Sequence, residues 1–338
     1  MNEPDWAEVV AQAVRAPSIH NTQPWLFTGT PDHLDLHVDR RRALPVIDRT
    51  ARQQVISCGI AGEFAAIALR AAGFGVEVAL LPDPGDPDHL MTVRVTGRLE
   101  ATEEDVAAVA AITQRHTVRA PFQARAMPAD LLERLQVEAA SYGVWSKHIT
   151  REEEEVATVF LIARAEEMEQ ADPAYVAELE RWVRTDADSG DGVPIGAVPS
   201  EDPAARPSNW LVRDFLAGQR ESHVFLPSAD QDAPPPEVER PTVLILGTDN
   251  DDRSAWLQAG RALGRLLLHA TSAGLAASPL TQALDWPATR AQLHTRLSLL
   301  GHPQMLLRIG YPVSAETEPT VISGRRPVSD VLTVHSAP

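Results

Sequence analysis

The sequence predicts an α+β fold built from two similar units, because three observations agree. Long helical stretches alternate with short strands in which apolar and polar residues alternate. The alanine-rich helix at 57–73 has a counterpart at 258–274. Both helices are followed by the same order of elements, a short strand and later a strand that ends in glycine. We therefore predict that each unit forms a sheet flanked by helices.

The two long helices carry matched glycines, which indicate how the units meet. Gly59 and Gly260 occupy corresponding positions. A glycine inside a helix costs about 1 kcal/mol relative to alanine, so the close approach of two backbones at a helix crossing is the expected compensation. We predict a duplicated unit whose long helices pack across a pseudo-two-fold axis. The alternative is a chance similarity of two alanine-rich helices.

The elements of the first part of the chain follow from periodicity and from glycine and proline breaks. Expected there are a helix at 5–15, strands at 25–27 and 34–38, a helix at 50–72, strands at 76–81 and 91–95, and a helix at 103–113. Helices are expected next at 129–140 and roughly through 152–184. The last part is expected to contain a strand at 242–247, a helix at 253–273, a strand and loop at 274–282, a helix at 286–297, a strand at 304–310 and a tail ending near 334.

Residues 186–240 differ from the rest of the chain. Asp, Gly, Pro and Ser dominate this stretch, and a few aromatic residues are scattered in it. A connection of this length is usually either a functional lid or disordered. The aromatic residues favour a lid that packs on another part of the protein.

Composition excludes several classes of partner. The 338 residues carry a net charge of −17, which repels nucleic acid and anionic lipid. No apolar run reaches the ~20 residues that a membrane span needs, and the N-terminus lacks the apolar core of a signal peptide. The single cysteine, Cys58, lies in an apolar run and is expected to be a small buried residue. No metal-ligand spacing of His and Cys occurs, and we expect a cytoplasmic protein.

The loop at 14–25 concentrates polar side chains on a rigid frame. Pro17 and Pro24 each fix φ and favour extended geometry in the residue before them. Between them lie five hydrogen-bonding side chains, those of Ser18, His20, Asn21, Thr22 and Gln23. Such a loop usually binds something flat and polar. The alternative is a proline-terminated helix whose polar residues only cap the next element. For His20, contact with a ligand and no such contact stay equally open.

This loop resembles the flavin-contacting A-P-S-x-x-N-x-Q-P-W segment of the nitroreductase-like FMN proteins. The matching residues are Ala16, Pro17, Ser18, Asn21, Gln23, Pro24 and Trp25. The whole chain is most similar to the double-length Acg-type branch, in which two nitroreductase-like halves are fused. This resemblance implies an intrachain pseudo-dimer in which each half is an antiparallel-type sheet flanked by helices. The halves would be 1–112 and 113–334, the second with a lid insertion at about 186–240.

The resemblance also implies that the two halves complement each other in a single FMN site. In the family, each site of a homodimer takes the P-S-x-x-N loop from one subunit and three other segments from its partner. Here the first half keeps the loop. The second half keeps an R-x-T-x-R segment at 115–119, a proline-marked loop at 277–282 and basic residues at 324–327. Where its own loop should fall, residues 141–147 lack the prolines and the asparagine. One flavin per chain is therefore expected.

The residues implied to bind FMN are Pro17, Ser18, Ile19, Asn21, Gln23, Arg115, Thr117, Arg119, Pro279, Leu280, Thr281, Gln282, Arg325 and Arg326. The arginines would hold the phosphate, because bidentate guanidinium is its natural partner. Arg115 or Arg119 would also stabilise negative charge near N1. Ser18 and Asn21 can reach the pyrimidine edge, and a backbone N–H near Thr281 or Gln282 would face N5. No side chain is assigned a catalytic role.

Two functions stay open. The first is an oxidoreductase in which FMN accepts hydride from NAD(P)H as co-substrate and passes it to a small nitro or quinone acceptor. The second is a flavin-storage protein that binds FMN without turnover, with the stretch 186–240 as a lid over the flavin. Neither function involves nucleic acid or a membrane. Since two halves mimic a family dimer, the protein is expected to be a monomer or a homodimer.

Overall fold

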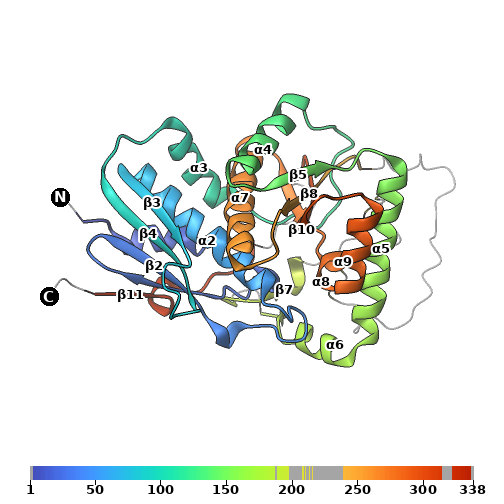
Figure 1. Cartoon of the computed structure of the whole chain (residues 1–338), viewed down its shortest axis with the longest axis horizontal. Helices are drawn as coiled ribbons and strands as arrows, with labels where there is room; N and C mark the ends of the chain where they lie inside the picture. Colours follow the sequence, from blue (N-terminus) through green and yellow to red (C-terminus); the bar gives the residue numbers. More distant parts are fainter. Residues whose placement is uncertain are drawn as a thin grey trace.

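The computed structural model describes residues 3–186, 189–197, 208, 210, 213, 215, 239–313 and 322–335. These residues form an α+β fold with two main sheets and a central pair of long helices, α2 (Arg52–Ala71) and α7 (Arg253–Ser272) (Figure 1). α2 packs against strands of the first sheet, and α7 packs against strands of the second. The prediction of sheets flanked by helices is confirmed.

The first sheet has the order β11–β1–β2–β4–β3. Its strands are β1 (Trp25–Gly29), β2 (His33–Val38), β3 (Phe74–Leu80), β4 (His89–Arg98) and β11 (Leu332–Val334). β11 runs parallel to β1, and all other neighbours are antiparallel. The sheet is therefore mixed, not antiparallel as expected. β11 lies in the stretch for which only a tail was expected, because three residues are too few to show strand periodicity.

The second sheet has the order β5–β8–β10–β9 and is antiparallel throughout. Its strands are β5 (Trp145–His148), β8 (Thr242–Thr248), β9 (Ala276–Pro279) and β10 (His302–Gly310). Every residue of β8 is buried, as expected for a strand covered on both faces. β5 was not expected as a strand. A further two-stranded parallel pair joins β6 (Val183–Arg184) to β7 (Val193–Pro194).

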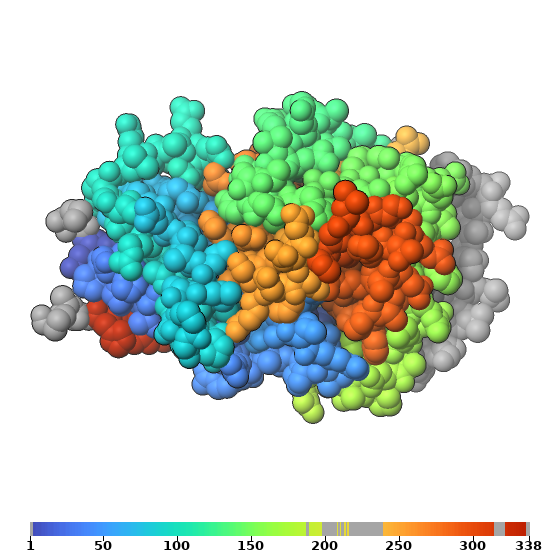
Figure 2. Space-filling view, in the orientation of Figure 1, coloured from blue at the N-terminus to red at the C-terminus, as the bar shows by residue number. Residues whose placement is uncertain are grey.

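Helices cover the outer surfaces of this framework. They are α1 (Trp6–Ala13), α3 (Glu103–Gln114), α4 (Ala129–Ser141), α5 (Glu152–Ala171), α6 (Pro173–Glu180), α8 (Gln282–Asp285) and α9 (Pro287–Arg296). Asp5, Thr102 and Asp172 cap α1, α3 and α6 by accepting backbone N–H groups. α5 packs on α8 and α9, and these two helices contact β10. In Figure 2, blue and cyan residues of the first part of the chain lie directly against orange residues of the last part.

The long helices α2 and α7 cross where their glycines meet. A Cβ atom added to Gly59 would lie 2.6 Å from the carbonyl oxygen of Leu257. A Cβ atom added to Gly260 would collide with the carbonyl oxygen of Ile56. Both obstacles are backbone atoms, which cannot rotate away. The predicted close approach of the two helix backbones is confirmed.

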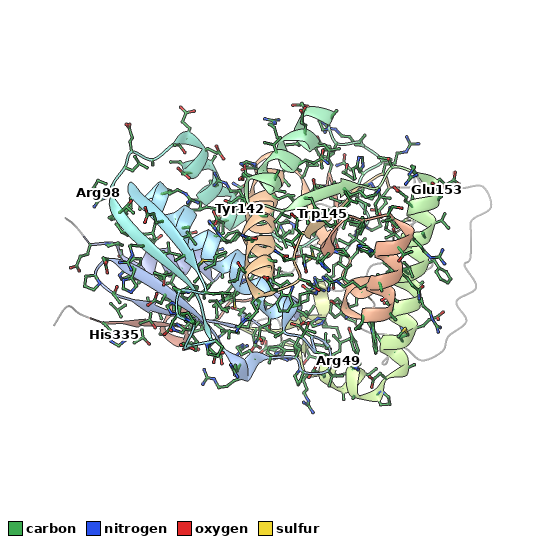
Figure 3. The ribbon with its side chains drawn as sticks, viewed as in Figure 1. Arg49, Arg98, Tyr142, Trp145, Glu153 and His335 are labelled. Carbon is green, nitrogen blue, oxygen red and sulfur yellow. The ribbon has the colours of Figure 1, made fainter. Side chains whose placement is uncertain are left out.

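A buried carboxylate ties the helices together beside this crossing. Glu63 of α2 is fully buried and accepts hydrogen bonds from Tyr142 Oη at 2.9 Å and from Arg261 Nε of α7 at 2.8 Å. Arg70 donates to the same carboxylate at 2.8 Å. Figure 3 places Tyr142, just after α4, beside α7. This network makes α2, α4 and α7 one packed unit.

α2 is a core helix although its composition resembles that of a membrane span. Within the described part of the chain it is the one helix long and apolar enough to cross a membrane, and 89% of the relevant window is buried inside the protein. Cys58 of α2 is fully buried, and its thiol donates to the carbonyl oxygen of Pro24 at 3.2 Å. Burial raises the pKa of this thiol, so it stays protonated and unreactive. The prediction that Cys58 is a small buried residue is confirmed.

We expect the substitution Gly260→Ala to lower the free energy of unfolding by about 1–3 kcal/mol, because the added methyl group forces the two helix backbones apart. Gly264→Ala is the matched control on the same helix, since its Cβ would meet side-chain atoms of Ile60 and Phe64 at 3.2 and 3.4 Å. The control should be close to neutral, because the higher helix propensity of alanine offsets the small adjustment. Urea titrations measure both values, and equal stability of the two variants would contradict the prediction.

Candidate functional site

One cavity lies at the ends of α2 and α7, where several segments that are distant in the sequence meet. Its polar wall comes from the loop at 17–21, the segment 115–119, the residues after β9 and the segment 322–325. Its apolar wall comes from α2, α7 and β10, through Ile56, Ile60, Leu263, Leu267, Met305 and Leu307. A large cavity that joins an apolar wall to converging polar groups is the usual form of a small-molecule site.

The loop at 17–23 has an unusual backbone conformation. His20, Asn21 and Gln23 have φ values of 44°, 55° and 50°, in the left-handed region that non-glycine residues rarely adopt. Ser18 Oγ stabilises this conformation by accepting the backbone N–H of Gln23 at 2.9 Å. Ser57 Oγ of α2 accepts the N–H of Ile19 at 3.2 Å. Such strain persists where the surroundings fix it, and it concentrates at functional sites.

Asn21 joins this loop to two distant segments. Its side-chain Nδ2 donates to the carbonyl oxygen of Gly192 at 2.9 Å and to that of Gly324 at 3.0 Å. Asn21 lines the cavity, but both of its amide protons are used in these bonds. Asn21 thus fixes the shape of the wall, and its side-chain oxygen is the atom left for a ligand.

Gln23 and Arg326 lie behind the cavity wall and contact each other. The backbone N–H of Arg326 donates to Gln23 Oε1 at 2.8 Å, and the Arg326 guanidinium donates to the carbonyl oxygen of Gln23 at 3.2 Å. Gln23 Nε2 donates to the carbonyl oxygen of Gly190 at 2.8 Å. Neither side chain lines the cavity, so the geometry gives both residues a role in holding the loop against the C-terminal segment.

The segment 115–119 is held by β9 and β10. Thr117 bridges to Ala277, and the next residue donates its backbone N–H to the carbonyl oxygen of Ala277 at 3.2 Å. The buried Arg308 guanidinium donates to the carbonyl oxygen of Arg119 at 3.0 Å. Arg308 in turn pairs with the buried Glu239 at 2.7 Å. The side chains of this segment therefore start from a fixed backbone.

Three arginines on this wall have no acidic partner. Within the residues that the structure describes, no carboxylate lies within 4 Å of Arg115, Arg119 or Arg325. Arg115 and Arg325 donate to the carbonyl oxygen of Arg15 at 3.4 and 3.3 Å. Arg119 donates to the carbonyl oxygen of Ala197 at 3.4 Å. Arg325 also donates to the carbonyl oxygens of Ser323 and Gly324, both at 2.9 Å. All of these partners are neutral, so no described residue compensates the three positive charges.

Burial affects the pKa values of the same three groups. It lowers the pKa of Arg115 to about 9, and the nearby charge of Arg325 adds to this effect. Burial also lowers the pKa of Arg119 and that of Arg325 to about 10. All three guanidinium groups remain charged at neutral pH. Buried positive charges without an acidic partner among the described residues are costly, and an anion would supply the missing compensation.

Arg213, on another wall of the cavity, is in contrast fully compensated. Its guanidinium lies 3.2 Å from Glu169 and 3.2 Å from Asp285, and it donates to the hydroxyl of Tyr175. Phe215 also lines the cavity, and the Arg119 guanidinium lies 5.2 Å from the centre of its ring.

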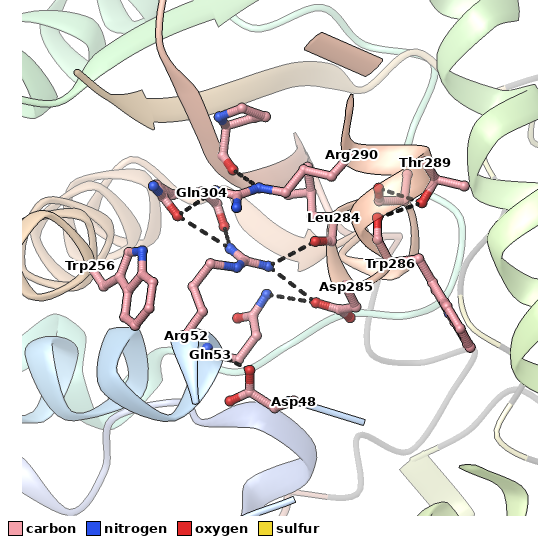
Figure 4. Close-up of polar contacts among 12 residues, drawn as sticks. Asp48, Arg52, Gln53, Trp256, Leu284, Asp285, Trp286, Thr289, Arg290 and Gln304 are labelled. Carbon is pink, nitrogen blue, oxygen red and sulfur yellow. Dashed lines mark hydrogen bonds and ion pairs between the residues drawn. The ribbon is translucent and has the colours of Figure 1, made fainter. Parts of the chain in front are cut away.

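Asp285 also fixes the start of α2 (Figure 4). It accepts hydrogen bonds from Arg52 Nη2 at 3.2 Å and from Gln53 Nε2 at 3.1 Å. Arg52 further donates to the carbonyl oxygen of Gln304 at 2.5 Å. Gln53 lines the cavity, so this buried network connects the cavity wall to α8 and β10.

The residues after β9 divide between the cavity and the core. Pro279 and Thr281 line the cavity. Leu280 is fully buried in the core and donates its backbone N–H to the carbonyl oxygen of Leu306 at 2.8 Å. Gln282 is also buried, and its side-chain amide has no hydrogen-bond partner among the described residues. Neither Leu280 nor Gln282 lines the cavity.

The structure therefore gathers most of the residues that the sequence predicted to share a site. Those that line the cavity are Pro17, Ser18, Ile19, Asn21, Arg115, Thr117, Arg119, Pro279, Thr281 and Arg325. Gln23, Leu280, Gln282 and Arg326 lie outside it. That these residues bind a cofactor remains a prediction.

Other residues of the wall were missed in the sequence. The residues of α2 at positions 53, 56, 57 and 60 have the spacing of one helix face, which was an available signal. Arg213 and Phe215 had no such signal, whereas Ser278 belongs to the proline-marked loop at 277–282 but was not singled out within it. Most of the predicted lid, at about 186–240, lies outside the described residues. No local sequence pattern in that polar stretch distinguishes Arg213 and Phe215, the two described residues of the stretch that line the cavity.

Comparisons with known proteins give a consistent result. Residues 112–311 match the model of the nitroreductase family. The Mycobacterium tuberculosis protein named "Putative NAD(P)H nitroreductase Rv3131" is 34% identical over 329 residues, which cover 96% of this chain and 90% of the relative. The "Putative NAD(P)H nitroreductase acg" of the same organism is 29% identical over 329 residues, with coverage of 97% and 95%.

A similarity to solved structures is also found. A nitroreductase from Bacteroides fragilis, solved with bound FMN, is 15% identical with a TM-score of 0.37, and the match covers 61% of this chain and 88% of that chain.

We expect inorganic phosphate at neutral pH to raise the melting temperature of the protein, since a ligand at 100 times its Kd stabilises the native state by about 2.7 kcal/mol. The variant Arg115→Met should lose at least half of this response. Without phosphate it should be as stable as the parent protein or more so, because an unpaired buried charge has been removed. Thermal unfolding with increasing phosphate measures both effects.

The matched control for this experiment is Arg94→Met. Arg94 is half exposed and pairs with the exposed Asp32 at 2.7 Å, so its loss should change stability by less than about 1 kcal/mol and should leave the phosphate response intact. An Arg115→Met variant that responds to phosphate as strongly as the control would contradict an anion site at this wall.

Proposed function

The chain belongs to the nitroreductase family, and from this we propose that it is an FMN-dependent oxidoreductase that uses NAD(P)H to reduce a small nitro or quinone acceptor. The names of its relatives support the nicotinamide donor. The observation that carries the proposal is the set of three arginines, Arg115, Arg119 and Arg325, that line one cavity and have no acidic partner among the described residues. The phosphate of FMN is the anion that this set would hold.

The cavity has groups that suit both the phosphate and the ring system of FMN. The buried Nε atoms of Arg115 and Arg325 have no partner within the described residues, so they are available to phosphate oxygens. The apolar wall formed by α2 and α7 suits a flat aromatic ring. The buried hydroxyl of Ser278 also lacks a partner among the described residues and can serve a polar atom of the ring.

When bound, FMN would supply the redox chemistry, accepting hydride from NAD(P)H and releasing it to the acceptor. The protein contributes binding, orientation and charge. Ser18 and Asn21 belong to the loop that would meet the pyrimidine edge, where Asn21 offers its side-chain oxygen. The positive charge of Arg115 or Arg119 would stabilise negative charge on that side of the ring. Of the two backbone N–H groups that the sequence suggested for N5, that of Thr281 would donate the hydrogen bond, because Thr281 lines the cavity and Gln282 does not.

We also propose that the chain is a fused pair of related halves, 1–112 and 113–334. The helix crossing supports this proposal because each contact across it has a counterpart with the roles of the two helices exchanged. Gly59 meets Leu257, and Gly260 meets Ile56. The same offset relates both pairs, since 260 − 59 = 201 and 257 − 56 = 201. Reciprocal contacts of this kind are characteristic of two-fold symmetric interfaces.

The offset of 201 also supports one site per chain. This offset identifies the region that would correspond to the cavity if the two halves were symmetric. Ile60 of the cavity wall corresponds to Arg261, and Leu263 of the wall corresponds to Gly62. Arg261 binds the buried Glu63 together with Tyr142. The space beside Gly62 is occupied by the side chain of Met91. The region related to the cavity is thus filled by packed side chains. A single site that is complete within one chain requires no partner subunit, so a monomer would suffice.

The flavin-storage function remains the second candidate because of Arg213 and Phe215. Both belong to the stretch that the sequence predicted as a lid, and both line the cavity. Arg213 is held by Glu169 and Asp285, which anchors this part of the stretch. An anchored aromatic side chain at the cavity would restrict the access of nicotinamide to a bound flavin.

We expect the purified protein to bind one FMN per chain and to be yellow. The variant Arg325→Ala should weaken FMN binding by about 1–3 kcal/mol, because it removes a charged hydrogen bond to the phosphate. Fluorescence titration with FMN measures stoichiometry and Kd, and Arg94→Ala is the surface control. A colourless protein that FMN cannot reconstitute would contradict the proposed function, and an unchanged Kd would remove Arg325 from the phosphate site.

Steady-state oxidation of NADH and NADPH with menadione or nitrofurazone separates the enzyme from the storage protein. If the protein is an enzyme, the intact flavin-loaded chain turns over. If it is a store, the intact chain is inactive and the variant Phe215→Ala gains activity, because access to the flavin is opened. If the intact chain and the Phe215→Ala variant are both inactive when loaded with flavin, the proposal that the protein is an enzyme is contradicted.

A further inference from the structure

His20 occupies a position that neither the fold nor the proposed cofactor contacts explain. It lies in the middle of the strained loop, lines the cavity and is only 8% exposed. Its buried Nε2 has no hydrogen-bond partner among the described residues. A buried polar atom without a partner costs about 1–3 kcal/mol, and such atoms are rare in native proteins unless a ligand or water meets them. The left-handed backbone of His20 adds to this cost.

The surroundings of His20 are aromatic and positively charged. The Phe215 ring lies edge-on to the imidazole, with 5.6 Å between the ring centres and an angle of 85°. Arg119 lies over the same Phe215 ring. Burial, together with the charges of Arg213 and Arg119, holds the pKa of His20 well below its ordinary value. The imidazole is therefore neutral at physiological pH, with one ring nitrogen as donor and the other as acceptor.

Two of the proposed phosphate contacts, Arg115 and Arg325, lie together, and neither is among the charges that act on His20. Arg115 and Arg325 contact the same carbonyl oxygen, that of Arg15, and the charge of Arg325 contributes to the lowered pKa of Arg115. The charges that act on His20 are instead those of Arg213 and Arg119. The cavity wall thus carries one pair of neighbouring arginines, Arg115 and Arg325, and a second group in which the neutral imidazole lies against the Phe215 ring.

We propose that His20 determines acceptor specificity by hydrogen-bonding, through Nε2, to an oxygen of an aromatic nitro or quinone substrate whose ring packs near Phe215. The inference rests on the proposed function and deepens it by naming the residue that selects the acceptor. The orphaned nitrogen gives the hydrogen bond, and the neutral state of the ring suits an uncharged oxygen. A site built to hydrogen-bond a substrate discriminates strongly against analogues without the matching group.

The test compares His20→Asn with His20→Gln in the flavin-loaded, full-length protein. Asparagine tolerates the left-handed backbone but is too short to place a nitrogen where Nε2 lies, whereas glutamine can approach that position. We expect kcat/KM for menadione and nitrofurazone to fall about tenfold or more in His20→Asn, as the loss of one hydrogen bond implies, and to recover partly in His20→Gln. The kcat/KM for NAD(P)H and the Kd for FMN should stay within about twofold of the parent values.

His302→Asn is the control, because His302 is exposed at the start of β10 and does not line the cavity. Unchanged acceptor kcat/KM in His20→Asn would overturn the inference, and so would a Kd for FMN weakened more than fivefold, which would assign His20 to the flavin. If the parent binds FMN without turnover, the Kd for 4-nitrobenzamide replaces kcat/KM, and an equal Kd in His20→Asn overturns the inference. A parent unable to bind FMN would instead sink the proposed function itself.

Discussion

The close crossing of α2 and α7 is the constraint on which the rest of the structure depends. Backbone contact at Gly59 and Gly260 brings the two helices closer than any larger residue would permit. Each helix covers its own sheet, so the crossing also fixes the relation between the sheets. Side chains of both helices next to the crossing, among them Ile60 and Leu263, form the apolar wall of the cavity. The space for a flat ligand therefore arises directly from the way the helices meet.

Charge distribution distinguishes the cavity from the rest of the protein. In a chain of net charge −17, acidic partners are abundant, and buried arginines elsewhere use them. Arg308 pairs with Glu239, and Arg52 pairs with Asp285. Such pairs offset the desolvation of buried charge. Arg115 and Arg325, in contrast, lie near each other and contact only backbone carbonyls in the described structure. Their arrangement destabilises the ligand-free fold, which is the expected signature of a site formed for binding.

The sequence predicted the type and order of most elements, because long amphipathic helices and apolar strands carry clear periodicity. The sequence also predicted that Asn21, Arg115 and Arg325 share one site, but only through the resemblance to a family. It did not predict β5 or β11, which are short strands completed by distant partners. It assigned Gln23 and Arg326 to the ligand, whereas the two residues contact each other. No local pattern separates a side chain that faces a cavity from one that supports it from behind. The same limit explains why Phe215 and Ser278 were missed.

The contacts between the two ends of the chain have a consequence for biosynthesis. Asn21 bonds to Gly324, 303 residues later, and β1 pairs with β11 at the C-terminus. The front loop can therefore adopt its final shape only after residue 324 has been synthesised and has left the exit tunnel of the ribosome. Most of the domain core can form earlier, because helices and hairpins are local. The cavity wall at this loop therefore forms late in folding, because its contacts join segments about 300 residues apart.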